Sequence, residues 1–177
     1  MQLSYRIRRV DGAERVLLAR SIAAIDDAGR TVVRGYHQDV TELMQARERA
    51  LQAEAEYRFL FEHNPLPMWV YDRESLTILA LNDAMVRHYG YAHEELVGAS
   101  MLSIRPESER ERLLEAARMA SRERPQGQVW THLHRDGSVM RMAVFSHDID
   151  FDGRSARLVA AQDVTERERA EERFQLV

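Results

Sequence analysis

Apolar and polar residues alternate in two separate stretches of the chain, and each stretch predicts three consecutive β-strands. The second stretch predicts strands over residues 129–135, 139–149 and 156–161. Asp136-Gly137 and Asp152-Gly153 join these strands, and an Asp-Gly pair suits the left-handed backbone of a tight hairpin. The first stretch predicts strands over residues 5–10, 16–25 and 31–36. Three strands without a covering helix rarely stand alone, so we interpret the first set as part of an incomplete domain.

An internal repeat supports this interpretation. The sequence Gln-Asp-Val-Thr-Glu occurs at residues 38–42 and again at residues 162–166, each time after the third strand. A helix is expected to begin after each copy, with Thr41 or Thr165 as its cap. Glu168 stands where it can complete a capping box with Thr165, whereas Met44 occupies the matching position of the first copy.

The helix expected over residues 42–62 carries apolar residues at alternating spacings of three and four. This spacing is typical of the a and d positions of a coiled coil and predicts a homodimer. A helix that packs on its own domain is the alternative. The proposed seam consists of Leu43, Ala46, Ala50, Ala53, Tyr57 and Leu60. Transferring this phase to the second helix gives Arg167, Ala170, Phe174 and Val177.

One full set of elements lies between residues 57 and 165. Two short strands are expected over residues 68–72 and 77–81, followed by a helix over residues 83–89 that Asn82 caps. A helical turn that ends at Gly98 and a longer helix from Pro106 to about Ser121 complete the middle of the unit. The element order is therefore two strands, several helices and three long strands.

Composition excludes several kinds of function. The chain has 177 residues, 45% of them hydrophobic, and a net charge of −4, so a folded core is expected but no surface for nucleic acid or anionic lipid. The absence of cysteine excludes disulfides, thiolate metal sites and a cysteine nucleophile. Without a long apolar run or a signal peptide, the segment is expected to be cytoplasmic and to make no membrane contact of its own.

Four motifs, in this order, resemble those of PAS sensory domains. They are Asn82, Gly90-Tyr91-x-x-Glu94-Glu95-Leu96-Val97-Gly98, Arg135-Asp136-Gly137-Ser138 and Asp163-Val164-Thr165-Glu166-Arg167. The resemblance implies an α+β fold: a five-stranded antiparallel sheet in the order 2-1-5-4-3, with helices on one face.

The same resemblance suggests how the chain is divided. Residues 1–41 are similar to the C-terminal half of a preceding PAS domain, the PAC part, and residues 42–62 form a linker helix. The complete PAS domain is expected over residues 57–165. Residues 166–177 are expected to form an exit helix and the start of a following domain.

PAS domains commonly serve as input or relay modules, so the resemblance implies a function without catalysis. The expected parent is a bacterial histidine kinase of a two-component system, or a diguanylate cyclase or phosphodiesterase, with a covalently linked output domain. Asp163 and Thr165, and Asp39 and Thr41 in the first copy, are the candidate signal junctions. We expect Asp163 to contact the segment through which the chain enters the domain, and so to stiffen the junction.

No cofactor is expected. Flavin photoreceptors of the PAS family use a cysteine where this chain has Met101, which excludes a covalent flavin adduct. Met142 and Ala161 stand where those proteins use polar flavin contacts, and residues 106–114 contain no histidine to ligate haem, so free flavin and haem are both disfavoured. His132 and His134 lack further ligands at a metal-binding spacing.

The inner face of the sheet leaves two interpretations open. It forms either a packed core or a pocket for a small apolar ligand that His132 orients. The inner positions are Trp69, Tyr71, Met85, Tyr89, Trp130, His132, Met140, Met142, Val144, Val159 and Ala161. The remaining histidines, His37, His63, His88, His93 and His147, are interpreted as surface residues.

The outer face of the sheet is also apolar. Its residues are Val139, Ala143, Phe145, Leu158 and Ala160. Because an exposed antiparallel face is normally polar, we expect either the helix over residues 47–62 or a second protomer to cover it.

Overall fold

A computed structural model of the chain describes residues 2–123 and 125–175. The chain divides into two compact units, Met1–Tyr57 and Arg58–Val177. Among the described residues, none of the helices has the length and apolar character needed to cross a membrane.

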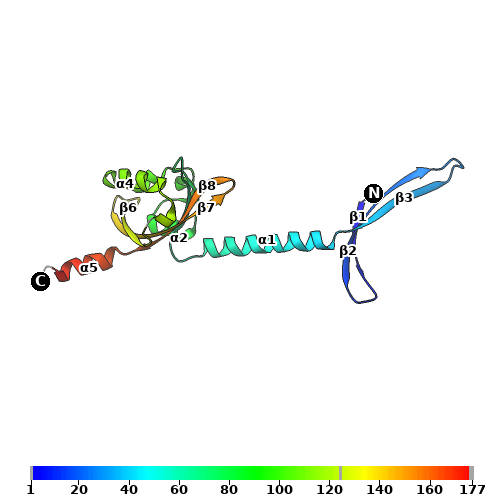
Figure 1. The fold of residues 1–177 in the computed structure, drawn as a ribbon, viewed down its shortest axis with the longest axis horizontal. Coiled ribbons are helices and arrows are strands. Elements are labelled where there is room, and N and C mark those ends of the chain that lie inside the picture. The colour runs from blue at the N-terminus through cyan, green and yellow to red at the C-terminus, as the bar shows by residue number, and fades with distance from the viewer. Residues whose placement is uncertain (1, 124, 176–177) are drawn as a thin grey trace. The chain divides into compact units, whose positions relative to one another are not determined.

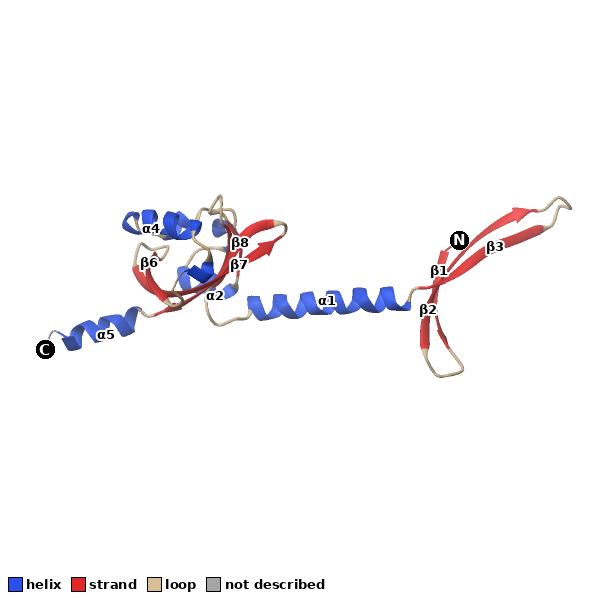
Figure 2. Cartoon of the chain, viewed as in Figure 1, coloured by secondary structure: helices blue, strands red, loops and turns tan. Residues whose placement is uncertain are grey.

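The first unit contains a three-stranded antiparallel sheet and most of one helix. The strands are β1 (Gln2–Arg8), β2 (Glu14–Ile25) and β3 (Thr31–Asp39), paired in the order β1-β2-β3 (Figure 2). The helix α1 (Thr41–Glu62) follows and continues into the second unit. The three predicted strands are confirmed, but β1 ends earlier than expected because residues 9–12 form the turn, where Gly12 N–H donates to the Arg9 carbonyl.

The second unit has the predicted element order. Its strands are β4 (Met68–Asp72), β5 (Ile78–Leu81), β6 (Gln128–Leu133), β7 (Val139–Phe151) and β8 (Arg154–Asp163). Its helices are α2 (Asp83–Tyr89), α3 (His93–Leu96), α4 (Glu107–Arg118) and α5 (Thr165–Gln175), with single 3-10 turns at Met101–Ile104 and Ser121–Glu123. The sheet is antiparallel in the order β5-β4-β8-β7-β6, which is 2-1-5-4-3 when the strands are counted from β4.

The hydrophobic core lies on the inner face of this sheet, beneath α2 and α4 (Figure 1). Every inner position named above is buried, and Trp69, Met85, Tyr89 and Met142 have no exposed surface. The strict alternation of side chains along each strand places these residues together.

The outer face is only partly covered within the described structure. Ala143 is buried, whereas Val139 and Phe145 are 47% and 42% exposed. The expectation that a helix or a second protomer covers this face therefore stays a prediction.

The predicted seam of α1 is exposed in the described structure. Leu43, Tyr57 and Leu60 are 70%, 75% and 65% exposed, and apart from Thr41 none of the α1 residues is buried. The homodimer expected from this seam therefore stays a prediction. Residue 177, the last position of the corresponding seam on α5, lies outside the described residues.

Two arginines, the buried Arg157 and the partly exposed Arg73, fix the C-terminal end of α4. The Arg157 side chain is fully buried, and its guanidinium donates to the carbonyls of Ala116 and Met119 and to Asp148. Arg73 donates to the Met119 carbonyl at 3.2 Å and lies 3.6 Å from Asp148. These bonds satisfy the last carbonyls of the helix and place positive charge at its negative end. The helix consequently ends at Arg118 and does not reach Ser121 as predicted.

Candidate functional site

The end of β8 and the start of α5 form a hydrogen-bonded junction. Asp163 Oδ1 accepts from the Thr165 backbone N–H at 2.8 Å and from the Thr165 hydroxyl at 2.5 Å. The Thr165 hydroxyl oxygen in turn accepts from the Arg141 N–H of β7 at 2.8 Å. Two side chains thus join the last strand, its neighbour and the exit helix.

Helix α2 reaches the same junction through His88. The Nε2 atom of His88 lies 2.8 Å from Asp163 Oδ2, and both side chains are about one-third exposed. Partial burial acts to raise the Asp163 pKa, but the Thr165 hydrogen bonds and His88 outweigh it, so the pKa is lowered overall. His88 is partly exposed, in keeping with its interpretation as a surface residue, but it also takes part in the junction. The expected contact of Asp163 with the incoming segment is wrong, because Asp163 bonds to α2 instead.

Arg141 fastens the first turn of α5 to the sheet. Its Nε lies 2.7 Å from Glu168 Oε2, and its Nη1 donates to the Thr131 hydroxyl at 2.6 Å. The predicted capping box is therefore wrong, because Glu168 pairs with Arg141 and the Thr165 hydroxyl bonds to Asp163 and β7.

The first unit contains the same junction at its own third strand. Asp39 Oδ1 accepts from the Thr41 N–H at 3.0 Å and from the Thr41 hydroxyl at 2.5 Å. The Thr41 hydroxyl oxygen accepts from the Val16 N–H at 2.8 Å, just as Thr165 accepts from Arg141. Thr41 hydrogen bonds lower the Asp39 pKa, and Arg15 at 3.5 Å adds to the effect. The repeated sequence therefore forms the same set of hydrogen bonds in both units.

Asn82 holds the segment through which the chain enters the second unit. Its Oδ1 accepts from the Met85 N–H of α2 at 3.0 Å and from the Met68 N–H of β4 at 2.9 Å. Its Nδ2 donates to the carbonyls of Phe61, Asn64 and Leu66 at 3.1, 3.4 and 2.9 Å. The Asn82 side chain is fully buried, so this one amide caps α2 and fixes the end of α1.

A buried polar pair lies at the centre of the core. The Tyr89 hydroxyl and His132 Nδ1 are 2.5 Å apart, and the Trp69 ring contacts both rings edge-on. Burial lowers the His132 pKa well below its usual value of 6.5, and the positive charge of Arg105 acts in the same direction. Burial likewise raises the Tyr89 pKa, so both groups are neutral near pH 7.

Within the described part of the chain, Nε2 of His132 and Nε1 of Trp69 are buried in this core and have no hydrogen-bond partner. A small cavity of about 10 Å³ lies beside Trp69, Trp130, Arg105 and Ser146. A volume of this size accommodates about one water molecule.

A sequence profile of the PAS fold matches residues 55–164. The chain belongs to the PAS-fold family. The profile covers the second unit from the end of α1 to the residue before α5, which is the region that the motifs mark. No curated protein matches the chain closely enough to be counted as a relative.

Solved structures give the same fold. The PAS domain of an HTR-like protein from Haloarcula marismortui is 20% identical with a TM-score of 0.55, covering 68% of this chain and 98% of that one. A domain of a sensory box sensor histidine kinase/response regulator from Geobacter sulfurreducens is 23% identical with a TM-score of 0.53, covering 63% and 94%. An RNA-binding light-oxygen-voltage receptor is 13% identical with a TM-score of 0.56, covering 99% and 81%.

Two of the PAS motifs meet in space. Arg135, in the turn between β6 and β7, has Nη2 2.7 Å from Glu95 Oε1 on α3. The Arg135 N–H also donates to the Tyr89 carbonyl at 2.9 Å. Gly90 follows Tyr89 and has a φ of +77°, and a Cβ there would lie 2.5 Å from His134 Nε2. A larger residue would therefore strain the backbone and displace the His134 ring.

The PAS core brings together all of the predicted ligand-binding residues, but it fills the space between them. Trp69, Tyr71, Trp130 and Val144 line the small cavity, and the others pack around them. Sequence reasoning missed Arg105 and Arg157, two buried arginines. Strand alternation could have indicated Arg157, which lies two residues before the inward-facing Val159 on β8.

We expect the stability of the PAS domain to fall as the pH drops below 6.5, because of His132. The unfolded chain binds a proton at His132 near its usual pKa of 6.5, whereas the folded domain does not, so stability rises with pH in this window. Below pH 6.5, the free energy of unfolding should fall by up to about 1.4 kcal/mol for each pH unit. Asp163 acts separately, because its lowered pKa affects stability only below about 3.8.

Urea unfolding at several pH values between 7.5 and 5 tests this expectation, with tryptophan fluorescence as the probe. His132→Gln removes the titration and should flatten the pH dependence. His147→Gln is the matched control, because His147 is exposed on β7 and should leave the slope unchanged. An unchanged slope in His132→Gln would refute the assignment.

Proposed function

We propose that this chain is a relay segment of a bacterial signal-transduction protein, either a histidine kinase or a diguanylate cyclase/phosphodiesterase. In this proposal the PAS domain passes a conformational change from α1 to α5, dimerises through its helices and performs no catalysis. It needs no flavin, haem or metal, its partners are a second copy and a linked output domain, and it works in the cytoplasm.

The observation that carries the proposal is the position of α2. At one end of this short helix, Asn82 binds the Phe61 carbonyl at the end of α1. At the other end, His88 binds Asp163, the last residue of β8 before α5. The adjacent Tyr89 bonds to His132 in the core. A rigid helix of two turns thus connects the incoming helix, the core and the outgoing helix.

The junction suits this role because its parts depend on one another. Asp163 orients Thr165, and Thr165 bonds to β7. In this proposal the direction of α5 depends on both bonds. A shift of α2 would pull His88 away from Asp163 and release the first turn of α5. In this proposal the junction switches between a bonded and a released state, which is what a relay requires.

A small-molecule sensor with an apolar pocket around Trp69, Trp130 and His132 is the second candidate. The unpartnered Nε2 of His132 and Nε1 of Trp69 favour it, because buried polar atoms are normally satisfied. The cavity of about 10 Å³ would have to expand to admit a ligand. Native mass spectrometry separates the candidates: an extra mass lost on denaturation supports the sensor, and a dimer at twice the bare chain mass supports the relay.

Disrupting the junction should loosen α5 without unfolding the domain. In Asp163→Ala, Thr165→Ala and His88→Ala, amide hydrogen exchange in the first turn of α5 should accelerate about tenfold, since each variant loses at least one capping or bridging bond. Exchange in β7 should stay slow. His93→Ala is the matched control on α3 and should behave like the unaltered chain.

The same variants placed in the parent protein should change its output. Unchanged output together with unchanged α5 exchange in Asp163→Ala and Thr165→Ala would disprove the relay proposal.

A further inference from the structure

We infer that one face of the β1-β2-β3 sheet binds a small organic phosphate, with the phosphate group between Arg20 and Arg34 and the apolar part of the molecule on Ile22. The site lies entirely within the first unit. The inference therefore goes beyond the relay proposed for the PAS domain and does not depend on it.

The two arginines lie on neighbouring strands and on the same face of the sheet. Arg20 of β2 stands opposite Tyr36 of β3, and Ile22 of β2 stands opposite Arg34 of β3. Directly opposed residues share a face, as do alternate residues of one strand, so these four side chains lie together. Arg20 and Arg34 are diagonal neighbours, at a typical separation of about 7–8 Å, which two long side chains can bridge around a ligand.

A concave site of about 820 Å³ lies on this part of the sheet, lined by the same four residues together with Gln2. This volume is within the usual range for sites that hold small ligands. Ile22 and Tyr36 are 69% and 53% exposed, so an apolar surface is open next to the two charges. Nη1 of Arg20 donates to the Tyr36 hydroxyl at 3.4 Å, which keeps this guanidinium at the site.

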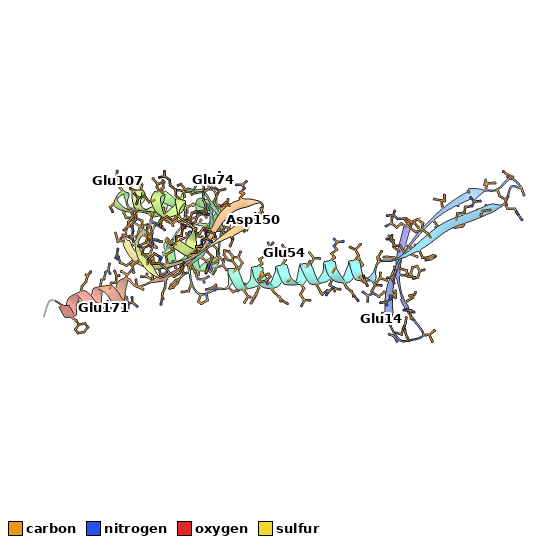
Figure 3. The ribbon with its side chains drawn as sticks, in the orientation of Figure 1. Glu14, Glu54, Glu74, Glu107, Asp150 and Glu171 are labelled. Atoms are coloured by element: carbon orange, nitrogen blue, oxygen red, sulfur yellow. The ribbon has the colours of Figure 1, made fainter. Side chains whose placement is uncertain are left out.

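Among the described residues, neither of these two arginines has a carboxylate partner. Four other arginines of the first unit form ion pairs, namely Arg8 with Glu14, Arg9 with Asp11, Arg15 with Asp39 and Arg30 with Asp26. Within the described strands, Glu14 is the one carboxylate on the same face as Arg20, and it pairs with Arg8. Figure 3 shows Glu14 at the end of the sheet where β1 turns into β2.

A phosphate group matches this arrangement of charge. Two neighbouring guanidiniums repel each other, so an anion between them is stabilised by both. A phosphate monoester carries between about 1.5 and 2 negative charges at pH 7 and has three acceptor oxygens. The planar guanidinium of arginine can donate two parallel hydrogen bonds to such a group.

The PAS sheet provides an internal comparison, because its strands β7 and β8 pair in the same register as β2 and β3 up to the Asp-x-Thr junction. In this register the pairs Phe145–Ala160 and His147–Leu158 stand where the first sheet has Arg20–Tyr36 and Ile22–Arg34. The same strand pairing thus forms without either arginine. This difference favours a role for the two arginines in binding, because folding does not require them.

Titration of the whole chain with phenyl phosphate, followed by amide NMR, tests the site. The signals of residues 20–22 and 34–36 should shift. Arg20→Phe and Arg34→Leu introduce the residues that the PAS sheet has at these positions, and each should weaken binding at least about tenfold. Arg6→Ala is the matched control, because Arg6 is an exposed arginine on the same face but outside the concave site, and it should leave binding unchanged.

Slow amide exchange in β2 shows which variants keep the sheet, and Arg20→Gln or Arg34→Gln replaces any that does not. Phenyl phosphate that binds the arginine variants as tightly as the unaltered chain would overturn the inference. Shifts confined to the PAS domain would overturn it as well.

Three further probes separate the charge of the ligand from its apolar part. Inorganic phosphate should bind about tenfold more weakly than phenyl phosphate, because it has no ring to cover Ile22. Benzoate, with a single negative charge, should also bind more weakly than phenyl phosphate. Benzyl alcohol has no charge and should leave the signals of residues 20–22 and 34–36 in place. Equal affinity for benzyl alcohol and phenyl phosphate would show a purely apolar site and contradict the role of the arginines.

Discussion

Replacing Arg157 with alanine is expected to lower the free energy of unfolding of the PAS domain by about 4 kcal/mol. The guanidinium is fully buried, with Nε 2.8 Å from Asp148 Oδ1 and Nη1 3.0 Å from the Ala116 carbonyl. Removing it leaves buried acceptors at the end of α4 without their donor and opens a cavity under that helix. Arg73, which lies 3.6 Å from Asp148, compensates only in part.

Urea unfolding followed by tryptophan fluorescence measures this loss selectively. Both tryptophans of the chain, Trp69 and Trp130, are buried in the PAS core, so their signal reports the unfolding of this domain. Arg154→Ala is the matched control at the exposed start of the same strand and should cost less than about 0.5 kcal/mol.

A second variant separates hydrogen bonding from packing. Arg157→Met refills much of the volume but provides no donor, so it should recover less than half of the loss. Full recovery in Arg157→Met would show that Arg157 acts by packing alone. A loss below about 1 kcal/mol in Arg157→Ala would contradict its role in holding α4.

The alternation of apolar residues was enough to predict the sheet and its inner face. Side chains on a strand point to opposite faces in turn, so Trp130, His132, Met140 and Met142 had to share one face once the Asp136-Gly137 turn was located. The packing density between them does not follow from alternation. It depends on how α4 lies over the sheet, which is why the sequence left a packed core and a pocket as alternatives.

Contacts between distant side chains were harder to predict. His88 and Asp163 lie on elements far apart in the sequence, and nothing local marks them as partners. The capping box failed for a similar reason: Glu168 has the right spacing for Thr165, but Arg141 on β7 offers it a charged partner at 2.7 Å. Local motifs identify which residues carry polar groups, whereas tertiary packing decides which groups they meet.

The contact that holds the end of α1 was also assigned to the wrong residue from the sequence. Sequence reasoning assigned a contact with the incoming segment to Asp163, but Asn82 makes it. Asn82 was predicted only as the cap of α2, a role that its Oδ1 fulfils. An amide can accept on one side and donate on the other, so the same residue also binds the segment over residues 61–66.

Asn82→Ala is therefore expected to destabilise the PAS domain by about 3 kcal/mol. The variant loses the acceptor for the Met68 and Met85 N–H groups and the donor for the Phe61 and Leu66 carbonyls, all around a fully buried side chain. Urea unfolding with tryptophan fluorescence again measures the loss. Asp83→Ala, at the exposed next position, is the control and should cost less than about 1 kcal/mol.

Asn82→Asp tests whether the two sides of the amide have separate roles. The variant keeps the oxygen that caps α2 but turns a second oxygen toward the Phe61 and Leu66 carbonyls, which repel it. Hydrogen exchange should then remain slow at Met85 and become fast over residues 61–66. If exchange became fast both at Met85 and over residues 61–66, Asn82 would only stabilise the core and would have no separate role in holding α1. If exchange became fast over residues 61–66 alone, the Asn82 amide N–H groups would be what links α1 to α2.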